Sequence, residues 1–195
     1  MNTTKTFNLA HPVLLACLIL AACAPRPELI SRSAAVPAGV DLSGRWQLRI
    51  EPGAKPMPSL DAEPGIRIPP ANRSDDTQRR PPKRSSGIAV KVFLENGKSL
   101  KISQTDTGLF ISFDRAIVEE YTFGENRVVS VGPIEAQRVS GWQARTFVVE
   151  TMDNDGALLT ERWYLDEGDG ALVRDISVVK SDREQLSSQQ RFDRG

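Results

Sequence analysis

From residue 41 onward, apolar and polar residues alternate in short runs that predict β-strands. The first run covers residues 41–50, where the apolar positions share one parity: Leu42, Gly44, Trp46, Leu48 and Ile50. Alternation of this kind is typical of a strand with one buried face. The sequence therefore predicts that the folded domain opens with a half-buried strand.

A hairpin is predicted next. Residues 99–104 and 109–113 alternate in the same way, and the turn-forming residues Thr-Asp-Thr-Gly lie between them. A four-residue loop places Ile102 opposite Ile111, so the apolar faces of the two strands match.

Further short strands follow at close spacing to the end of the chain: 117–123, 127–131, 135–139, 144–152, 157–165, 171–179 and 187–193. An antiparallel series of this kind buries one face, and closing the sheet on itself removes its exposed edges. We therefore predict an all-β fold: a single small antiparallel up-and-down β-barrel or meander of about 8–10 strands, with at most one short helix.

The stretch before the hairpin is open to two interpretations. Residues 88–94 alternate weakly and precede Asn96-Gly97, which favours a hairpin. That register, however, places Val92 opposite Lys101. We favour a short helix over residues 86–95, because it gathers its apolar side chains on one side: Ile88, Ala89, Val92 and Phe93.

A second hairpin carries a possible site. If Asp155-Gly156 forms a two-residue turn, Glu150 faces Glu161 among apolar neighbours. Facing carboxylates repel each other, and on an inward face one of them has a raised pKa. The pair would bind a cation or share a proton. The alternatives are a register shifted by one residue, or neutralisation by an arginine: Arg145, Arg162, Arg174 or Arg191.

The N-terminus has the features of an export signal. Lys5 precedes an apolar run that ends in Leu-Ala-Ala before Cys23, and this run is too short to span a bilayer. A cysteine at this place resembles the lipobox of bacterial lipoproteins, in which the thiol receives diacylglycerol and becomes the first residue. Residues 1–22 are accordingly predicted to be a cleaved signal peptide, and Cys23 the lipidation site.

Two segments lack any apolar period. Residues 23–40 are rich in proline and alanine and are predicted to be a flexible tether. The domain of residues 41–195 is interrupted at about 51–86 by a proline-rich insertion, which we predict to be disordered. The insertion carries a basic cluster, which is interpreted as a solvated loop; the alternative is a contact with anionic lipid headgroups or phosphate-bearing envelope polymers. The cluster consists of Arg79, Arg80, Lys83 and Arg84.

The composition of the chain excludes several classes of binding and catalytic site. Lys plus Arg and Asp plus Glu number 25 each, so no net charge favours nucleic acid. His11 and Cys17 leave with the signal and Cys23 carries the lipid, so the mature domain has no free thiol and no imidazole. This removes Ser-His-Asp and Cys-His catalysis and His-ligated metal sites. We expect no enzyme, no catalytic residue, no cofactor and no metal.

The short motifs of the domain carry a family resemblance. Residues 43–46, Ser-Gly-Arg-Trp, resemble the Gly-x-Trp opening of lipocalin-like barrels, and about residues 41–194 are similar to lipocalin-like lipoproteins of Gram-negative bacteria. The resemblance implies that Trp46 closes one end of the barrel near a late arginine, Arg191 or Arg194. Because residue 24 is alanine and not aspartate, it also implies an outer-membrane anchor facing the periplasm.

These observations lead to two expectations for function. The first is a non-enzymatic binding module, anchored to the membrane by its N-terminal lipid, that contacts a small apolar ligand or an envelope protein. The alternative is a protein-interaction, inhibitor or structural domain with a filled barrel. The candidate ligand-binding residues are Trp46, Glu150, Glu161 and Trp163. The sequence carries no signal for oligomeric state.

Overall fold

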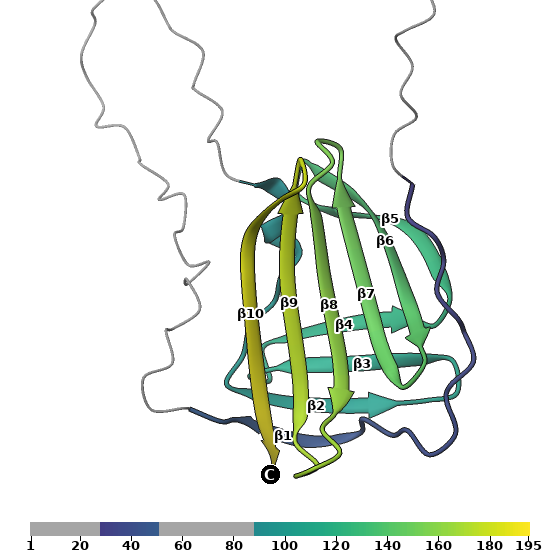
Figure 1. Cartoon of the computed structure of the whole chain (residues 1–195), viewed down its shortest axis with the longest axis vertical. Coiled ribbons are helices and arrows are strands. Elements are labelled where there is room, and N and C mark those ends of the chain that lie inside the picture. Colours follow the sequence, from purple (N-terminus) through teal and green to yellow (C-terminus); the bar gives the residue numbers. More distant parts are fainter. Residues whose placement is uncertain (1–27, 51–87) are drawn as a thin grey trace, which may run out of the picture.

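The computed structural model describes residues 28–50 and 88–195 (Figure 1). These residues form ten β-strands and one 3-10 helix. The bounds are β1 Gly44–Leu48, η1 Ala89–Phe93, β2 Ser99–Gln104, β3 Gly108–Phe113, β4 Ile117–Thr122, β5 Glu125–Val131, β6 Ile134–Gln143, β7 Thr146–Asp153, β8 Leu158–Leu165, β9 Leu172–Lys180 and β10 Arg183–Arg194. None of the described helices is long and apolar enough to cross a membrane.

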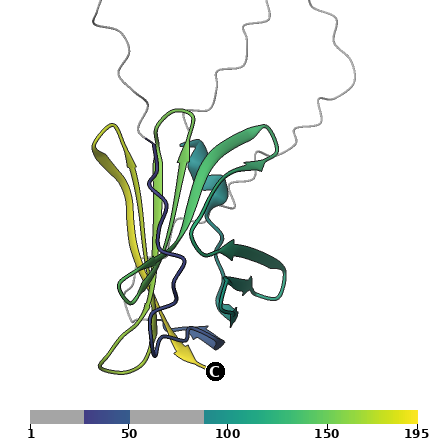
Figure 2. The ribbon, with the colours of Figure 1, turned by 90° about the vertical axis from the view of Figure 1, so that its right-hand side faces the viewer.

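All ten strands belong to one antiparallel sheet in the order β4-β3-β2-β1-β10-β9-β8-β7-β6-β5. β1 pairs with both β2 and β10, so the first and last strands of the domain lie side by side. In Figure 1, β7 to β10 run across β1 to β4, and Figure 2 shows the two groups as the walls of a curved sheet. The predicted all-β, up-and-down barrel is confirmed, in a nearly closed form.

The backbone hydrogen bonding around the barrel is interrupted between β4 and β5. These two strands follow each other in sequence but do not pair. Side chains bridge this seam instead. Arg138 Nη1 lies 3.0 Å from Glu119 Oε2, and Ser140 Oγ donates to the Thr122 carbonyl at 2.9 Å. Polar side-chain contacts from β6 therefore help to hold β4 in place, although β4 and β5 form no strand pairing.

The β2–β3 hairpin has the predicted register. Ile102 lies opposite Ile111 and Leu100 opposite Phe113 across the four-residue loop. The first strand is shorter than its pattern suggests. β1 ends at Leu48, and Ile50 beyond it is 80% exposed, so the apolar parity continues past the end of the sheet.

The predicted two-residue turn at Asp155-Gly156 is wrong. Asp153 N donates to the Ala157 carbonyl at 3.0 Å, which leaves a loop of three residues, 154–156, with Gly156 in the left-handed region at φ 76°. Asp153 Oδ1 also accepts the Ala157 N–H at 2.9 Å and favours the longer loop. The extra loop residue shifts the hairpin register by one.

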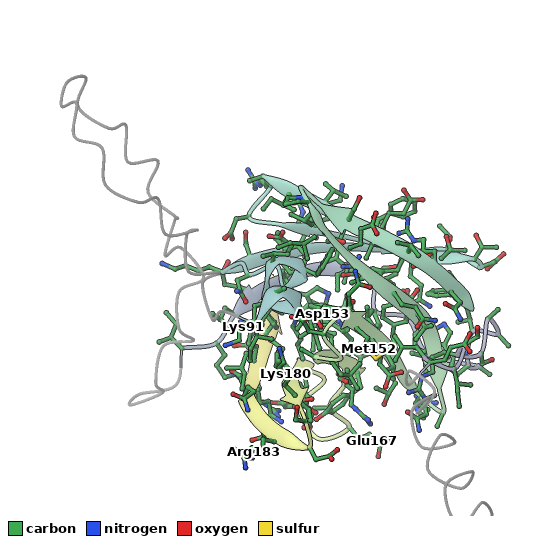
Figure 3. All side chains as sticks on the ribbon, turned by 90° about the horizontal axis from the view of Figure 1, so that it is seen from above. Lys91, Met152, Asp153, Glu167, Lys180 and Arg183 are labelled. Atoms are coloured by element: carbon green, nitrogen blue, oxygen red, sulfur yellow. The ribbon has the colours of Figure 1, made fainter. Side chains whose placement is uncertain are left out.

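The stretch before β2 is helical, but η1 is shorter than the predicted helix and has another buried face. Val90 and Phe93 are buried, whereas Val92, predicted to face the core, is 41% exposed. The Val90 N–H donates to Asp153 Oδ2 at 3.1 Å. Figure 3 shows η1 with Lys91 and the β7 end with Asp153 at the same end of the barrel. A 3-10 turn has three residues per turn, so its buried positions differ from those of an α-helix.

Residues 28–40, assigned from the sequence to a flexible tether, lie against the barrel. Ser33 forms an antiparallel bridge with Trp142, and Arg32 pairs with Glu150 at 2.7 Å. The ordered domain therefore begins well before residue 41. The predicted signal peptide, the predicted lipidation site Cys23 and the predicted insertion at about 51–86 lie outside the described residues.

The core has two parts. The larger cluster fills the crossing of the two groups of strands and includes Trp46, Phe113 and Trp163. The smaller cluster packs η1 against β6, β8 and β9 through side chains such as Val90, Leu159 and Val178. The helix thus closes one end of the barrel with apolar contacts.

Candidate functional site

The barrel interior is filled by side chains at the level of the predicted ligand site. Trp46, Ile102, Phe113 and Trp163 are each between 0 and 2% exposed and pack in one cluster. Val148 is also buried, but it alternates with the inward residues Phe147 and Val149 and so lies on the outer face of β7. The four side chains belong to one buried cluster, and the Phe113 and Trp163 rings within it lie 6.4 Å apart between centroids.

A buried ion pair lies beside this cluster. Arg174 on β9 donates through Nε and Nη2 to Glu161 Oε2 on β8, at 2.9 and 2.5 Å. Both side chains are at most 2% exposed. The Arg174 guanidinium also stacks over the Trp163 ring at 4.6 Å and the Phe113 ring at 5.4 Å. Glu161 is therefore neutralised by an arginine, one of the alternatives that the sequence leaves open.

A second buried arginine faces the seam. Arg138 on β6 donates to Thr151 Oγ1 at 3.1 Å and pairs with Glu119 on β4. Its guanidinium lies 5.7 Å from the Phe93 ring and 5.6 Å from the Tyr121 ring. Burial raises the pKa of Tyr121 well above its usual value, and the nearby Glu161 carboxylate adds to the effect. The phenol is therefore neutral.

Glu95 completes what we call the interior charge cluster: Glu95, Glu119, Arg138, Glu161 and Arg174. The Glu95 carbonyl accepts a hydrogen bond from Arg174 Nη1 at 2.8 Å. Its own carboxyl has a raised pKa, first because burial disfavours the charged form and then because Glu119 lies close. Three carboxylates thus share two guanidinium groups, and Glu95 is the one without an arginine partner among the described residues.

We predict that Glu95→Gln stabilises the protein at neutral pH. Folded Glu95 holds its proton to a higher pH than unfolded Glu95, so the free energy of unfolding falls as pH rises above the ordinary Glu pKa. Urea unfolding should show the variant and the parent nearly equal at pH 4 and the variant more stable at pH 7. The exposed Glu184→Gln serves as control and should give the same small difference at both pH values. A Glu95→Gln variant that loses stability at pH 7 would contradict the prediction.

Trp46 lies at the other end of the barrel from η1. Its Nε1 donates to the Leu42 carbonyl at 3.0 Å, and the Arg194 guanidinium lies 4.6 Å from its ring centroid. Of the two arginines named from the sequence, Arg194 is therefore the one against the tryptophan. Arg191 pairs with Asp166 and Asp169 instead.

The four predicted ligand-binding residues do not form one site. Glu161 and Trp163 are interior neighbours on β8, and Trp46 packs in the same core at the barrel end. Glu150 lies opposite Thr160, not Glu161, and binds Arg32 on the outer side. The predicted carboxylate pair is wrong, because the three-residue loop shifted the register and placed Val149 opposite Glu161.

Three hollows on the outer surface of the described barrel were not found by sequence reasoning. One, of about 380 Å³, crosses β8, β9 and β10 and is lined by hydroxyls together with Arg162 and Asp175. A second, of about 270 Å³, lies by Tyr164 and Arg145. The largest of the three, about 490 Å³, crosses β1, β2 and β3. The outward polar positions of each strand can be predicted from its alternation. Which of these positions share one hollow depends on the order of the strands in the sheet.

Within residues 28–50 and 88–195, no group of three or more Cys, His, Asp or Glu side chains is arranged to hold a metal ion. No protein-family model matches the chain, and no curated protein is detectably similar to it in sequence.

Proposed function

We propose that this chain is a lipid-anchored protein of the Gram-negative cell envelope whose barrel is a non-enzymatic interaction module with a filled interior. The observation that carries the proposal is the packing of Trp46, Phe113 and Trp163, which are 0 to 1% exposed and occupy the space where a cargo molecule would sit. A small-molecule site usually offers about 300–1,000 Å³ of concave space. The hollows of the described residues that approach this size lie on the outer surface.

The anchor in this proposal is diacylglycerol on Cys23. Its support is the sequence pattern, in which Leu-Ala-Ala-Cys follows a short apolar run. Residues 23–27 precede the first described residue, and five residues span at most about 18 Å. Residues 28–40 lie along the barrel, so the anchor holds the domain close to the membrane, with the periplasm on its other side.

Intact-mass analysis of the full chain, expressed in a Gram-negative host and extracted in detergent, tests the anchor. We expect a mature protein that begins at Cys23 and carries acyl mass, located in the outer-membrane fraction. Cys23→Ser should abolish the acyl mass and the membrane fractionation, whereas Cys17→Ser should change neither. A mature protein without an adduct would overturn the anchoring half of the proposal.

Native mass spectrometry of the same preparation tests the filled barrel. We expect the mass of the acylated mature protein with no further small molecule bound. A stoichiometric small apolar molecule that remains bound would instead support the carrier function and would contradict a filled interior. Substituting Phe113 by alanine opens space in the core, so apolar ligand uptake by that variant but not by the parent is the expected contrast.

A further inference from the structure

The outer face of β1, β2 and β3 carries positive charges that the rest of the described chain does not neutralise. The groove of about 490 Å³ on this face is lined by outward polar side chains of the three strands, by Arg115 in the β3–β4 turn, and by Trp46, Leu100 and Gly195. The outward side chains are those of Arg45, Gln47, Ser99, Lys101 and Ser112. The groove is large enough for a small molecule rather than a lone ion.

Two of its cations are placed where a sheet ordinarily avoids them. Arg45 on β1 lies directly opposite Lys101 on β2, and Lys101 lies opposite Ser112 on β3. Like charges at facing positions destabilise a sheet. Neither Arg45 nor Lys101 takes part in an ion pair among the described residues. The facing cations therefore lack an internal explanation.

The third cation sits in a strained turn beside them. Asp114 and Arg115 have φ of 48° and 61°, and the Ala116 N–H donates to the Phe113 carbonyl at 2.9 Å. The loop between β3 and β4 has three residues, 114–116, because Phe113 pairs with Ile117, and its first two residues are in the left-handed region that favours glycine or asparagine. Arginine at such a place carries a conformational cost, and strain of this kind gathers at functional sites.

The acidic side chains next to the groove are already bound elsewhere. Asp114 accepts hydrogen bonds from the backbone N–H groups of Lys98 and Ser99 and from the Ser99 hydroxyl. Asp193, which lies opposite Gln47, pairs with Arg49. The groove thus keeps three cations together with the Gln47 amide and the Ser112 hydroxyl for an external partner.

We propose that this groove binds a phosphate group carried on a hydroxyl-bearing body, such as a sugar or a glycerol. The Arg45 and Arg115 guanidinium groups and the Lys101 ammonium bind the phosphate, because guanidinium matches its oxygens in a bidentate manner. Gln47 and Ser112 hydrogen-bond the hydroxyl groups. The inference goes beyond the anchored interaction module and does not depend on the lipid at Cys23.

Titration of the full chain with glucose 1-phosphate tests the site, with glucose as the uncharged control. We expect saturable binding of the phosphosugar that weakens with salt, and no binding of glucose. Arg45→Gln should weaken it about tenfold, the loss of one charge-assisted contact. Arg183→Gln removes an exposed cation from the far end of β10 and should leave the affinity unchanged. Equal effects of the two substitutions would overturn the proposal.

Arg115→Gly separates ligand binding from folding. Glycine relieves the left-handed turn, so the melting temperature should not fall, while phosphosugar affinity should fall about tenfold. Asp182→Gly likewise relieves backbone strain, in the Ser181-Asp182 turn, where φ is 50° and 59°. Because this turn lies away from the groove, the substitution should leave phosphosugar binding unchanged. Unaltered affinity in Arg115→Gly would contradict the role of this side chain.

A vesicle-binding experiment shows whether the phosphate belongs to a lipid headgroup or to a soluble phosphosugar. The Cys23→Ser chain, which lacks an acyl group, is mixed with phosphatidylcholine vesicles with and without phosphatidylglycerol. Phosphatidylglycerol-dependent binding that Arg45→Gln abolishes assigns the groove to lipid headgroups, whereas saturation by glucose 1-phosphate alone assigns it to a soluble phosphosugar. If neither probe binds in an Arg45-dependent manner, the site does not exist as proposed.

Discussion

Replacing Arg174 by methionine should lower the free energy of unfolding by about 3–5 kcal/mol, the usual cost of breaking a buried ion pair. The substitution leaves Glu161, 2% exposed, without its partner in the middle of the barrel. It also removes the cation stacked on Trp163 and the hydrogen bonds to the Glu95 carbonyl and Gln190. Urea unfolding followed by tryptophan fluorescence measures the change.

Two further variants show whether the loss comes from the unpaired carboxylate. Adding Glu161→Leu to Arg174→Met removes the buried charge and should restore part of the lost stability, since apolar replacements of buried pairs are often tolerated. Arg49→Met removes an exposed partner of Asp193 and Asp169 and should change stability little. If Arg174→Met costs no more than Arg49→Met, the buried pair is not a stabilising element.

Replacing Trp46 by alanine should cost about 3–5 kcal/mol, as expected when a large aromatic side chain is removed from a core. Trp46 is 1% exposed and belongs to the larger core cluster. Its removal also exposes the Leu42 carbonyl, which accepts the indole N–H, and leaves Arg194 without its ring. Thermal and urea unfolding both report the loss.

A matched pair of tryptophans isolates the hydrogen bond. Trp46→Phe removes the indole N–H bond to the Leu42 carbonyl, whereas the Nε1 of buried Trp142 has no partner among the described residues. An unpaired buried donor is unfavourable, so Trp142→Phe loses no bond and should cost less than Trp46→Phe. The opposite order would show that ring packing, and not the polar contact, distinguishes the two positions.

The local sequence pattern was sufficient to predict strand register where the loop length and the apolar alternation of the two strands favour the same pairing. In the β2–β3 hairpin, apolar side chains on both strands match only in one register, and the four-residue loop permits that register. The fold class followed from the same periodicity, because short alternating strands at close spacing bury one face and close on themselves. The inward position of Glu161 could also be read from its apolar neighbours.

The candidate site was harder to predict from the sequence, because one additional residue in a loop changes which side chains face each other across the hairpin. Asp155-Gly156 is a sound turn signal, yet Asp153 uses its carboxylate to hold the longer loop and the η1 N–H at once. Glu150 therefore does not face Glu161. It pairs with Arg32, which lies in the segment that the sequence predicted to be a tether. A contact between residues so far apart in sequence leaves no local signal.

The alternating positions from residue 41 to the end of the chain by themselves determined an all-β barrel with an apolar interior, because period-two hydrophobicity selects which face is buried. Only the tertiary structure decided that Arg174 neutralises Glu161, that η1 closes one end, and that Arg45, Lys101 and Arg115 share one groove. These features arise from contacts between strands whose order and register depend on loop geometry and on the pairing of β1 with β10. Periodicity within one strand carries no record of its neighbour across the sheet.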